Sequence, residues 1–213
     1  MVVGAHYDHL GVDELLVGDQ IYNGADDNAS GVVAVLQLAK AFAVSGEKPL
    51  RSIIFAFFDG EEINYLGSEY FIANFQQPQA IKSYINIDMI GREGLLPEMY
   101  PKFKIPEATI ENTATGKQFH LAYTEELSTK GEQASQDITK HHLDIIVKPS
   151  VIAHKSRGTD ALSFSLRTIP VAWFFTGLHP DYHTPIDEVS TLDLDKVTDI
   201  TQSAYLFLRS LAN

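Results

Sequence analysis

Four short apolar runs, each ending in histidine or acidic residues, constrain the fold of this chain more than any other feature. They are VVGAH (2–6), IIFAFFDGEE (53–62), YINID (84–88) and VAWFFTGLHPDYH (171–183). Continuous runs of this kind are typical of strands buried on both faces. Open α/β sheets gather their sites at the carboxyl ends of such strands. The polar residues that end the runs, with one further aspartate, are therefore expected to form one site: His6, Asp27, Glu61, Glu62, Asp88 and His183.

Helical patterns separate the apolar runs. From Ser30 the segment SGVVAVLQLAKAFAVSG has helical spacing, with Asn28 or Ser30 as its N-cap. We expect further helices over 67–75, 159–167 and 194–211, and strands over 2–5, 52–58, 84–87, 143–148 and 170–176. Residues 9–28 form a polar loop, and 92–156 show no clear period outside 143–148. The alternation predicts one domain over 1–213, a three-layer α/β/α sandwich with a mostly parallel, doubly wound sheet.

Composition excludes several classes of function. The 16 Lys and Arg against 28 Asp and Glu give a net charge of −12, which argues against nucleic-acid and anionic-membrane partners. The chain has no cysteine, so thiolate zinc sites and disulfides are excluded. No apolar run approaches the length of a transmembrane helix, and no membrane insertion is expected. Part of the acidic excess is consistent with a metal site.

The motif HYDHLG places His6 and Asp8 two residues apart, so on a strand they share a face. A carboxylate that accepts the ring N–H of a histidine fixes the tautomer and leaves the other nitrogen free for a metal. A loop histidine with an acidic neighbour is the alternative. The motif on its own therefore leaves both interpretations open.

The motif GADDNASG is more specific. Asp26 and Asp27 are short carboxylates at the start of the first helix, bracketed by Gly24 and Gly31. Glycine lets the backbone come close to a ligand, and a helix N-terminus stabilises nearby negative charge. The alternative is an ordinary N-cap with two surface acids. The two glycines favour the functional interpretation.

The motif FFDGEE ends a very apolar strand with two adjacent acids, Glu61 and Glu62. Two like charges there are costly without a cation or a shared proton. Neighbouring residues at a strand end point in different directions, so one carboxylate can bind metal while the other acts as a general base. A solvated acidic turn is the alternative. His141 and His142 are expected in a polar, helical segment without matching acids, and therefore on the surface.

Joint occurrence of these motifs favours a zinc site. Two histidines with Asp and Glu carboxylates match the ligand preference of zinc, and a shared aspartate can bridge two ions about 3.5–4 Å apart. Calcium prefers more oxygen ligands and no imidazole.

The motifs also resemble those of the zinc-dependent exopeptidase family of bacterial di-zinc aminopeptidases (peptidase family M28-like), to which the transferrin receptor is a more distant relative. The resemblance is carried by HYDHLG, GADDNASG, FFDGEEINYLGSEYF, NIDMIG, RGTDALSF and FFTGLHPDYHTPID.

The resemblance implies a role for each residue of the site. Asp27 bridges two zinc ions, and Glu61 is the general base and acid. One ion is completed by His6 and Asp88 and the other by Glu62 and His183. Three further roles are implied: Asp8 orients His6, Tyr182 polarises the scissile carbonyl, and Asp160 acts either beneath the ligands or on the substrate amine.

The implied activity is a metal-dependent aminopeptidase that removes N-terminal residues from peptides with a free N-terminus, using two Zn²⁺ per chain. Two alternatives remain: a glutaminyl cyclase of the same fold with one zinc, and a non-catalytic binding module on the same scaffold. The family domain usually has further elements before the first histidine motif, so we expect this chain to lack N-terminal elements of a full-length protein. The resemblance suggests a periplasmic or secreted location, although no signal peptide precedes MVVGAH. Walls that set substrate preference are expected in 92–156.

Overall fold

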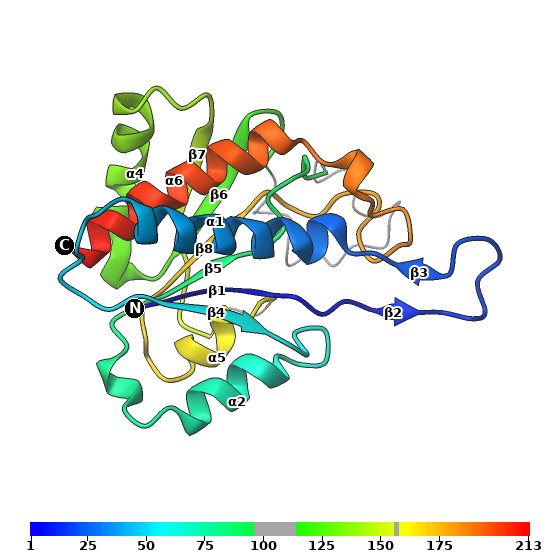
Figure 1. The fold of residues 1–213 in the computed structure, drawn as a ribbon, viewed down its shortest axis with the longest axis horizontal. Helices are drawn as coiled ribbons and strands as arrows, with labels where there is room; N and C mark the ends of the chain where they lie inside the picture. Colours follow the sequence, from blue (N-terminus) through cyan, green and yellow to red (C-terminus); the bar gives the residue numbers. More distant parts are fainter. Residues whose placement is uncertain (96–113, 156–157) are drawn as a thin grey trace.

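The structure, a computed structural model, describes residues 1–95, 114–155 and 158–213. Six strands form its central sheet: β1 (Val2–His6), β4 (Ile54–Phe58), β5 (Tyr84–Ile87), β6 (Gln118–Tyr123), β7 (Ile146–Val151) and β8 (Val171–Phe175). Their order is β4-β1-β5-β8-β6-β7 (Figure 1). The first four are parallel to one another, β6 is antiparallel to β8, and β7 is parallel to β6. The expected mostly parallel sheet is confirmed.

Helices cover both faces of the sheet, which confirms the expected three-layer sandwich (Figure 1). One layer contains α1 (Gly31–Val44), α4 (Ser128–Lys140) and α6 (Leu194–Ala212). The other contains α2 (Leu66–Asn74) and α5 (Ala161–Ser165). A small hairpin of β2 (Gly11–Val12) and β3 (Ile21–Tyr22) projects from the body at the right of Figure 1. None of the described helices is both long and apolar enough to cross a membrane.

The alternation of side chains along the strands divides the core into two parts. On β1, Val3 and Ala5 join the cluster under α1, α4 and α6, whereas Val2 joins the cluster under α2 and α5. In the first cluster Phe174 stacks on Phe119 at 5.5 Å between ring centroids and meets Phe207 edge-on at 5.7 Å. These contacts join β8, β6 and α6. Both faces of the sheet are therefore apolar, as the continuous runs predict.

Most predicted elements agree with the structure to within two residues at each end, and the exceptions lie in the two segments without a clear pattern. The predicted loop over 9–28 contains the β2–β3 hairpin. The prediction of a strand over 143–148 is wrong by three residues, because the strand is Ile146–Val151. Strand β6 was not predicted, and for helix α4 the sequence predicts only a polar, helical segment around His141 and His142. Helix α4 buries only Gly131, Ala134 and Ile138, so small residues replace the usual apolar stripe.

Two other expectations for 92–156 have different outcomes. His141 and His142 are exposed just after α4, as expected. The expected specificity walls fall partly on residues 96–113, which lie outside the described part of the chain.

We expect Phe174→Ala to lower the free energy of unfolding by about 3–5 kcal/mol, because the truncation leaves a cavity between β6, β8 and α6. Phe174 is fully buried, with 0% exposure. Urea denaturation followed by circular dichroism measures the change. Leu15→Ala is the control, since Leu15 is 92% exposed and should change stability by less than about 0.5 kcal/mol. Equal effects of the two substitutions would contradict the assignment of Phe174 to the core.

Candidate metal centre

Polar side chains meet at one edge of the sheet, because β4, β1, β5 and β8 are parallel and end on the same side. His6 ends β1, Glu61 and Glu62 follow β4, Asp88 follows β5, and His183 follows β8. In the described residues all of these except Glu61 belong to two groups of potential metal ligands, which Asp27 and His9 complete. We name them the inner group (His6, Asp27 and Asp88) and the outer group (His9, Asp27, Glu62 and His183). Within each group the ligand atoms lie within 4.8 Å of one another. The inner residues are all buried, whereas three outer residues are half-buried.

Asp27 belongs to both groups, and its two carboxylate oxygens face different ones. Its Oδ1 lies 3.3 Å from His6 Nε2, and its Oδ2 lies 3.2 Å from His183 Nε2. His6 Nε2 is also 3.6 Å from Asp88 Oδ1, and His183 Nε2 is 3.2 Å from Glu62 Oε2. A carboxylate placed in this way can bridge two cations.

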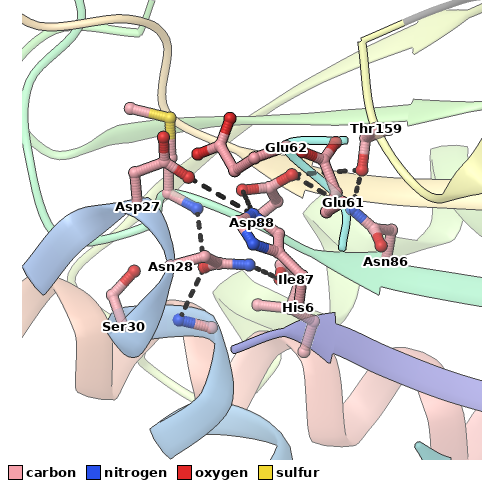
Figure 2. A network of polar contacts seen from close by, with 12 residues as sticks. His6, Asp27, Asn28, Ser30, Glu61, Glu62, Asn86, Ile87, Asp88 and Thr159 are labelled. Carbon is pink, nitrogen blue, oxygen red and sulfur yellow. Dashed lines mark hydrogen bonds and ion pairs between the residues drawn. The ribbon is translucent and has the colours of Figure 1, made fainter. Parts of the chain in front are cut away.

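Glu61 belongs to neither ligand group of the described residues. Figure 2 shows its side chain beside Asp88, apart from that of Glu62. Asp8 fixes the turn that carries both glutamates, because its carboxylate accepts the backbone N–H of Glu61 at 3.0 Å and of Glu62 at 3.2 Å. His6 Nδ1 lies 3.5 Å from Asp8 Oδ1 and 3.2 Å from the Asp8 carbonyl oxygen. Asp8 thus lies where it can orient His6, and that role stays a prediction.

The loop that carries Asp27 is tied to the end of β5 by Asn28 (Figure 2). The Asn28 amide donates to the Ile87 carbonyl at 3.0 Å, and its Oδ1 accepts the N–H groups of Gly31 and Met89. A Cβ on Gly31 would lie 2.3 Å from the Ile87 carbonyl oxygen, so only glycine allows this approach. Of the two residues predicted to cap α1, Asn28 is the one whose side chain accepts a helix N–H.

The two adjacent aspartates of GADDNASG have separate environments. Asp27 faces the ligand groups, whereas Asp26 points the other way and accepts the N–H of Gly91 at 2.6 Å. Asp26 Oδ2 lies 3.5 Å from His179 Nε2, with both side chains fully buried. The carboxylate of Asp187 accepts the backbone N–H of Asp26 at 2.9 and 3.1 Å and that of Asp27 at 3.0 Å. Asp187 therefore holds the backbone from which Asp27 projects.

Asp88 is held by two neutral side chains. Thr159 donates to Asp88 Oδ2 at 3.1 Å, and the Asn86 amide lies 3.4 Å from the same oxygen (Figure 2). Asp160 follows Thr159 and is fully buried. Both predicted roles of Asp160, beneath the ligands or on a substrate amine, stay predictions.

Tyr182 stacks on His183, with 3.7 Å between the ring centroids and 21° between the rings. Its ring is half-buried and packs against the apolar cluster that contains Met89 and Phe175. Burial, followed by the negative charge of Asp27, raises the pKa of the Tyr182 hydroxyl, which keeps it protonated and able to donate a hydrogen bond. Its predicted role in polarising a carbonyl stays a prediction.

Burial and mutual repulsion disturb the ionisation of the whole cluster. Burial, followed by the negative charge of Asp88, raises the pKa of Glu61 to about 9, and burial raises the pKa of Asp160 to about 7. Burial opposes protonation of His183, yet its hydrogen bonds to Asp27 and Glu62 raise its pKa to about 9. Closely spaced buried carboxylates favour a bound cation, which neutralises their charge. The nitrogen and oxygen donors of both groups fit zinc.

The structure adds residues that sequence reasoning missed. His9 lies in the outer group, while Asp187, Asn86 and Thr159 support the ligands. A sequence signal existed for His9 alone, since HYDHLG places a second imidazole three residues after His6. The supporting hydrogen bonds join distant segments, and no spacing in the chain indicates them.

The site consists of two groups of carboxylates and histidines that share Asp27, at the carboxyl ends of the strands of an open α/β sheet. Comparisons with known proteins identify the family of this chain. The family model "Peptidase family M28" matches residues 1–208. The chain belongs to this peptidase family.

Two relatives match parts of the chain. The leupeptin-inactivating enzyme 1 of Streptomyces exfoliatus is 31% identical over 121 residues, which is 55% of this chain and 27% of the relative. The leucine aminopeptidase 1 of Trichophyton equinum is 34% identical over 96 residues, which is 43% of this chain and 25% of the relative. Each match therefore spans about a quarter of the relative's length.

Solved structures share the fold at lower identity. The LapA aminopeptidase of Legionella pneumophila has a TM-score of 0.73 at 23% identity, over 99% of this chain and 51% of its own. The glutaminyl cyclase of Porphyromonas gingivalis has a TM-score of 0.68 at 17% identity, over 99% of this chain and 72% of its own. Fold alone does not separate these two activities, so the side chains of the site decide between them.

We expect Asp187→Ala to lower the free energy of unfolding by about 2–5 kcal/mol, because it leaves the buried N–H groups of Asp26 and Asp27 without their acceptor. Thermal and urea unfolding measure the change. Glu188→Ala is the matched control, since Glu188 accepts one exposed hydrogen bond from Asn23 and should cost less than about 1 kcal/mol. An Asp187→Ala protein as stable as the control would contradict the anchoring role.

Proposed function

We propose that this chain is a metal-dependent aminopeptidase whose two zinc ions share Asp27. One observation carries the proposal: the two oxygens of Asp27 face the inner and the outer ligand group, at 3.3 Å from His6 and 3.2 Å from His183. Membership of peptidase family M28 supports a peptidase. The aminopeptidases among the relatives and solved structures support removal of N-terminal residues.

Each ion takes ligands from distant parts of the sheet edge. Beside Asp27, the inner ion is held by His6 and Asp88, and the outer ion by Glu62 and His183. When bound, zinc supplies Lewis-acid chemistry, because it lowers the pKa of a coordinated water and polarises a carbonyl. The hydrogen bonds of Asp88 to Thr159 and Asn86 orient one of its oxygens and leave the other toward His6.

Glu61 is the residue that moves protons. It stands beside the inner group without belonging to it. Cations bound beside it would favour its ionised form, and that carboxylate accepts a proton from the attacking water. The same carboxylic acid then donates that proton to the nitrogen of the leaving amine. Tyr182 carries a protonated hydroxyl, which donates to the oxygen of the scissile carbonyl. The acidic surroundings attract the protonated N-terminus of a peptide.

We expect Glu61→Gln to lower kcat by about 10³-fold or more on aminoacyl chromogenic substrates while zinc content stays unchanged, because the amide cannot accept the proton. Asp59→Asn, an exposed change in the same turn, is the control and should keep the activity of the original protein. Near-normal turnover of Glu61→Gln would contradict the role of Glu61. Loss of zinc in that variant would instead make Glu61 a ligand.

Metal analysis separates the proposal from a glutaminyl cyclase and from a binding module. We expect two zinc ions per chain, loss of hydrolysis after dialysis against a chelator, and recovery on adding zinc. One zinc with cyclisation of N-terminal glutamine would support the cyclase, and a chain that binds no zinc and shows no thermal shift would support the binding module. Cleavage of N-blocked substrates as fast as free ones would rule out an aminopeptidase.

A further inference from the structure

The outer group contains a side chain that the five-ligand scheme leaves unused. His9 Nδ1 lies 2.9 Å from Glu62 Oε1 and 3.8 Å from Asp27 Oδ2. Its ring meets that of His183 edge-on, with 5.5 Å between centroids. His9 Nδ1 thus lies beside three other potential ligands of one ion.

The distances in the outer group suit a tetrahedral ion. For zinc bonds of about 2.0–2.1 Å, tetrahedral geometry places neighbouring ligand atoms about 3.3–3.4 Å apart. His9 Nδ1 lies 2.9 Å from Glu62 Oε1 and 3.8 Å from Asp27 Oδ2, and His183 Nε2 lies 3.2 Å from Glu62 Oε2 and 3.2 Å from Asp27 Oδ2. The two histidines therefore face different oxygens of Glu62. With one ligand atom from each residue, the four atoms lie within 4.8 Å of one another, so a rotation of the Glu62 carboxylate and small shifts of the rings would bring them to tetrahedral spacing.

The chain is shaped to keep His9 in this place. Its side chain is only 8% exposed, and its Nε2 has no hydrogen-bond partner among the described residues. Gly24 has a φ of +61°, and a Cβ there would lie 2.8 Å from His9 Cγ and 2.4 Å from the Asp27 carbonyl oxygen. Glycine at position 24 therefore leaves the space that the imidazole occupies.

We propose that His9 is the fourth protein ligand of the outer ion, beside Asp27, Glu62 and His183. This inference rests on the proposed zinc centre and deepens it. Four protein ligands close a tetrahedral zinc site, whereas three leave a position for water or substrate. The outer ion is then coordinatively saturated, and the inner ion keeps the open position.

The location of Glu61 agrees with an open position on the inner ion. The charges that act on it most strongly are those of Asp88 and His6, both of the inner group. The proton-moving residue therefore stands beside the ion that keeps an open position.

Replacement of His9 by cysteine tests the ligation directly. The chain has no native cysteine, so a thiolate-to-metal absorption band in His9→Cys can come only from residue 9. The bond from zinc to sulfur, at about 2.3 Å, is longer than that to nitrogen and offsets the shorter side chain. We expect cobalt-loaded His9→Cys to show the thiolate-to-cobalt band in the near ultraviolet. Cobalt-loaded His141→Cys, altered at an exposed histidine, should lack the band.

A second variant, His9→Ala, measures how much His9 contributes to the affinity for zinc. We expect His9→Ala to weaken one of the two zinc sites, in titration against a chelating indicator, by more than the about 10–100-fold typical of residues that only orient a ligand. His141→Ala should bind both ions like the original chain. Circular dichroism of the metal-free proteins checks that each variant folds.

The outcomes separate this inference from the proposed function. Two bound cobalt ions without a thiolate band in His9→Cys, together with two tight zinc sites in His9→Ala, would overturn the ligand role of His9 and leave the proposed function standing. A loss within about 100-fold in His9→Ala and no thiolate band would make His9 a residue that positions Glu62. An unaltered chain that binds no zinc would overturn both proposals.

Discussion

Repulsion between buried carboxylates is the constraint on which this structure depends. Asp27 and Asp88 lie almost fully buried at the edge of the sheet, with Glu61 close to them. The fold restrains Asp88 with two neutral donors, the side chains of Thr159 and Asn86, whereas the segment that carries Asp27 is held through Asn28 and Asp187. Neutral donors orient carboxylates without removing their charge. Imidazoles supply part of the remaining compensation, which explains the histidines between the acids in both groups, and bound cations would supply the rest.

The parts of the fold that the sequence predicts are those in which burial leaves a strong apolar signal. β1, β5 and β8 are buried along their whole length, and β4 lies at the edge of the sheet with a mixed burial pattern. All four runs are mainly apolar. Helix α4 has no comparable signal, because Gly131 and Ala134 allow it to approach β6 closely without large apolar side chains. β6 contains the polar His120 in the middle of a buried strand. Tertiary packing rather than local pattern specifies both elements.

The residues of the site also fall into those that the sequence predicts and those that it does not. Residues placed at strand ends could be identified because parallel strands of one sheet bring their ends together. His6 and Asp88 meet as that rule requires, and Asp27 links them to His183. Asp187 could not be identified as the anchor of Asp27, because 160 residues separate them and no period relates their positions. His9 was missed for another reason: its motif already contained one histidine that fitted the strand end. Local spacing shows which residues can reach the edge, and only the folded backbone shows which of them meet.

The two ligand groups differ in burial and in the number of potential ligands, and these differences indicate a different role for each ion. The inner group is fully buried and has Glu61 beside it, while the outer group is half-buried and contains four potential ligands instead of three. Exposure alone would assign substrate contact to the outer ion. The number of ligands indicates instead that substrate contacts the inner ion, because an ion with four protein ligands offers no position to water, whatever its exposure. With His9 as a ligand, the outer ion would serve mainly to fix Asp27 and to add positive charge, and the inner ion would lie next to Glu61, the residue proposed to move the proton. Burial of that reacting position also strengthens each electrostatic contact made there, since less water screens it.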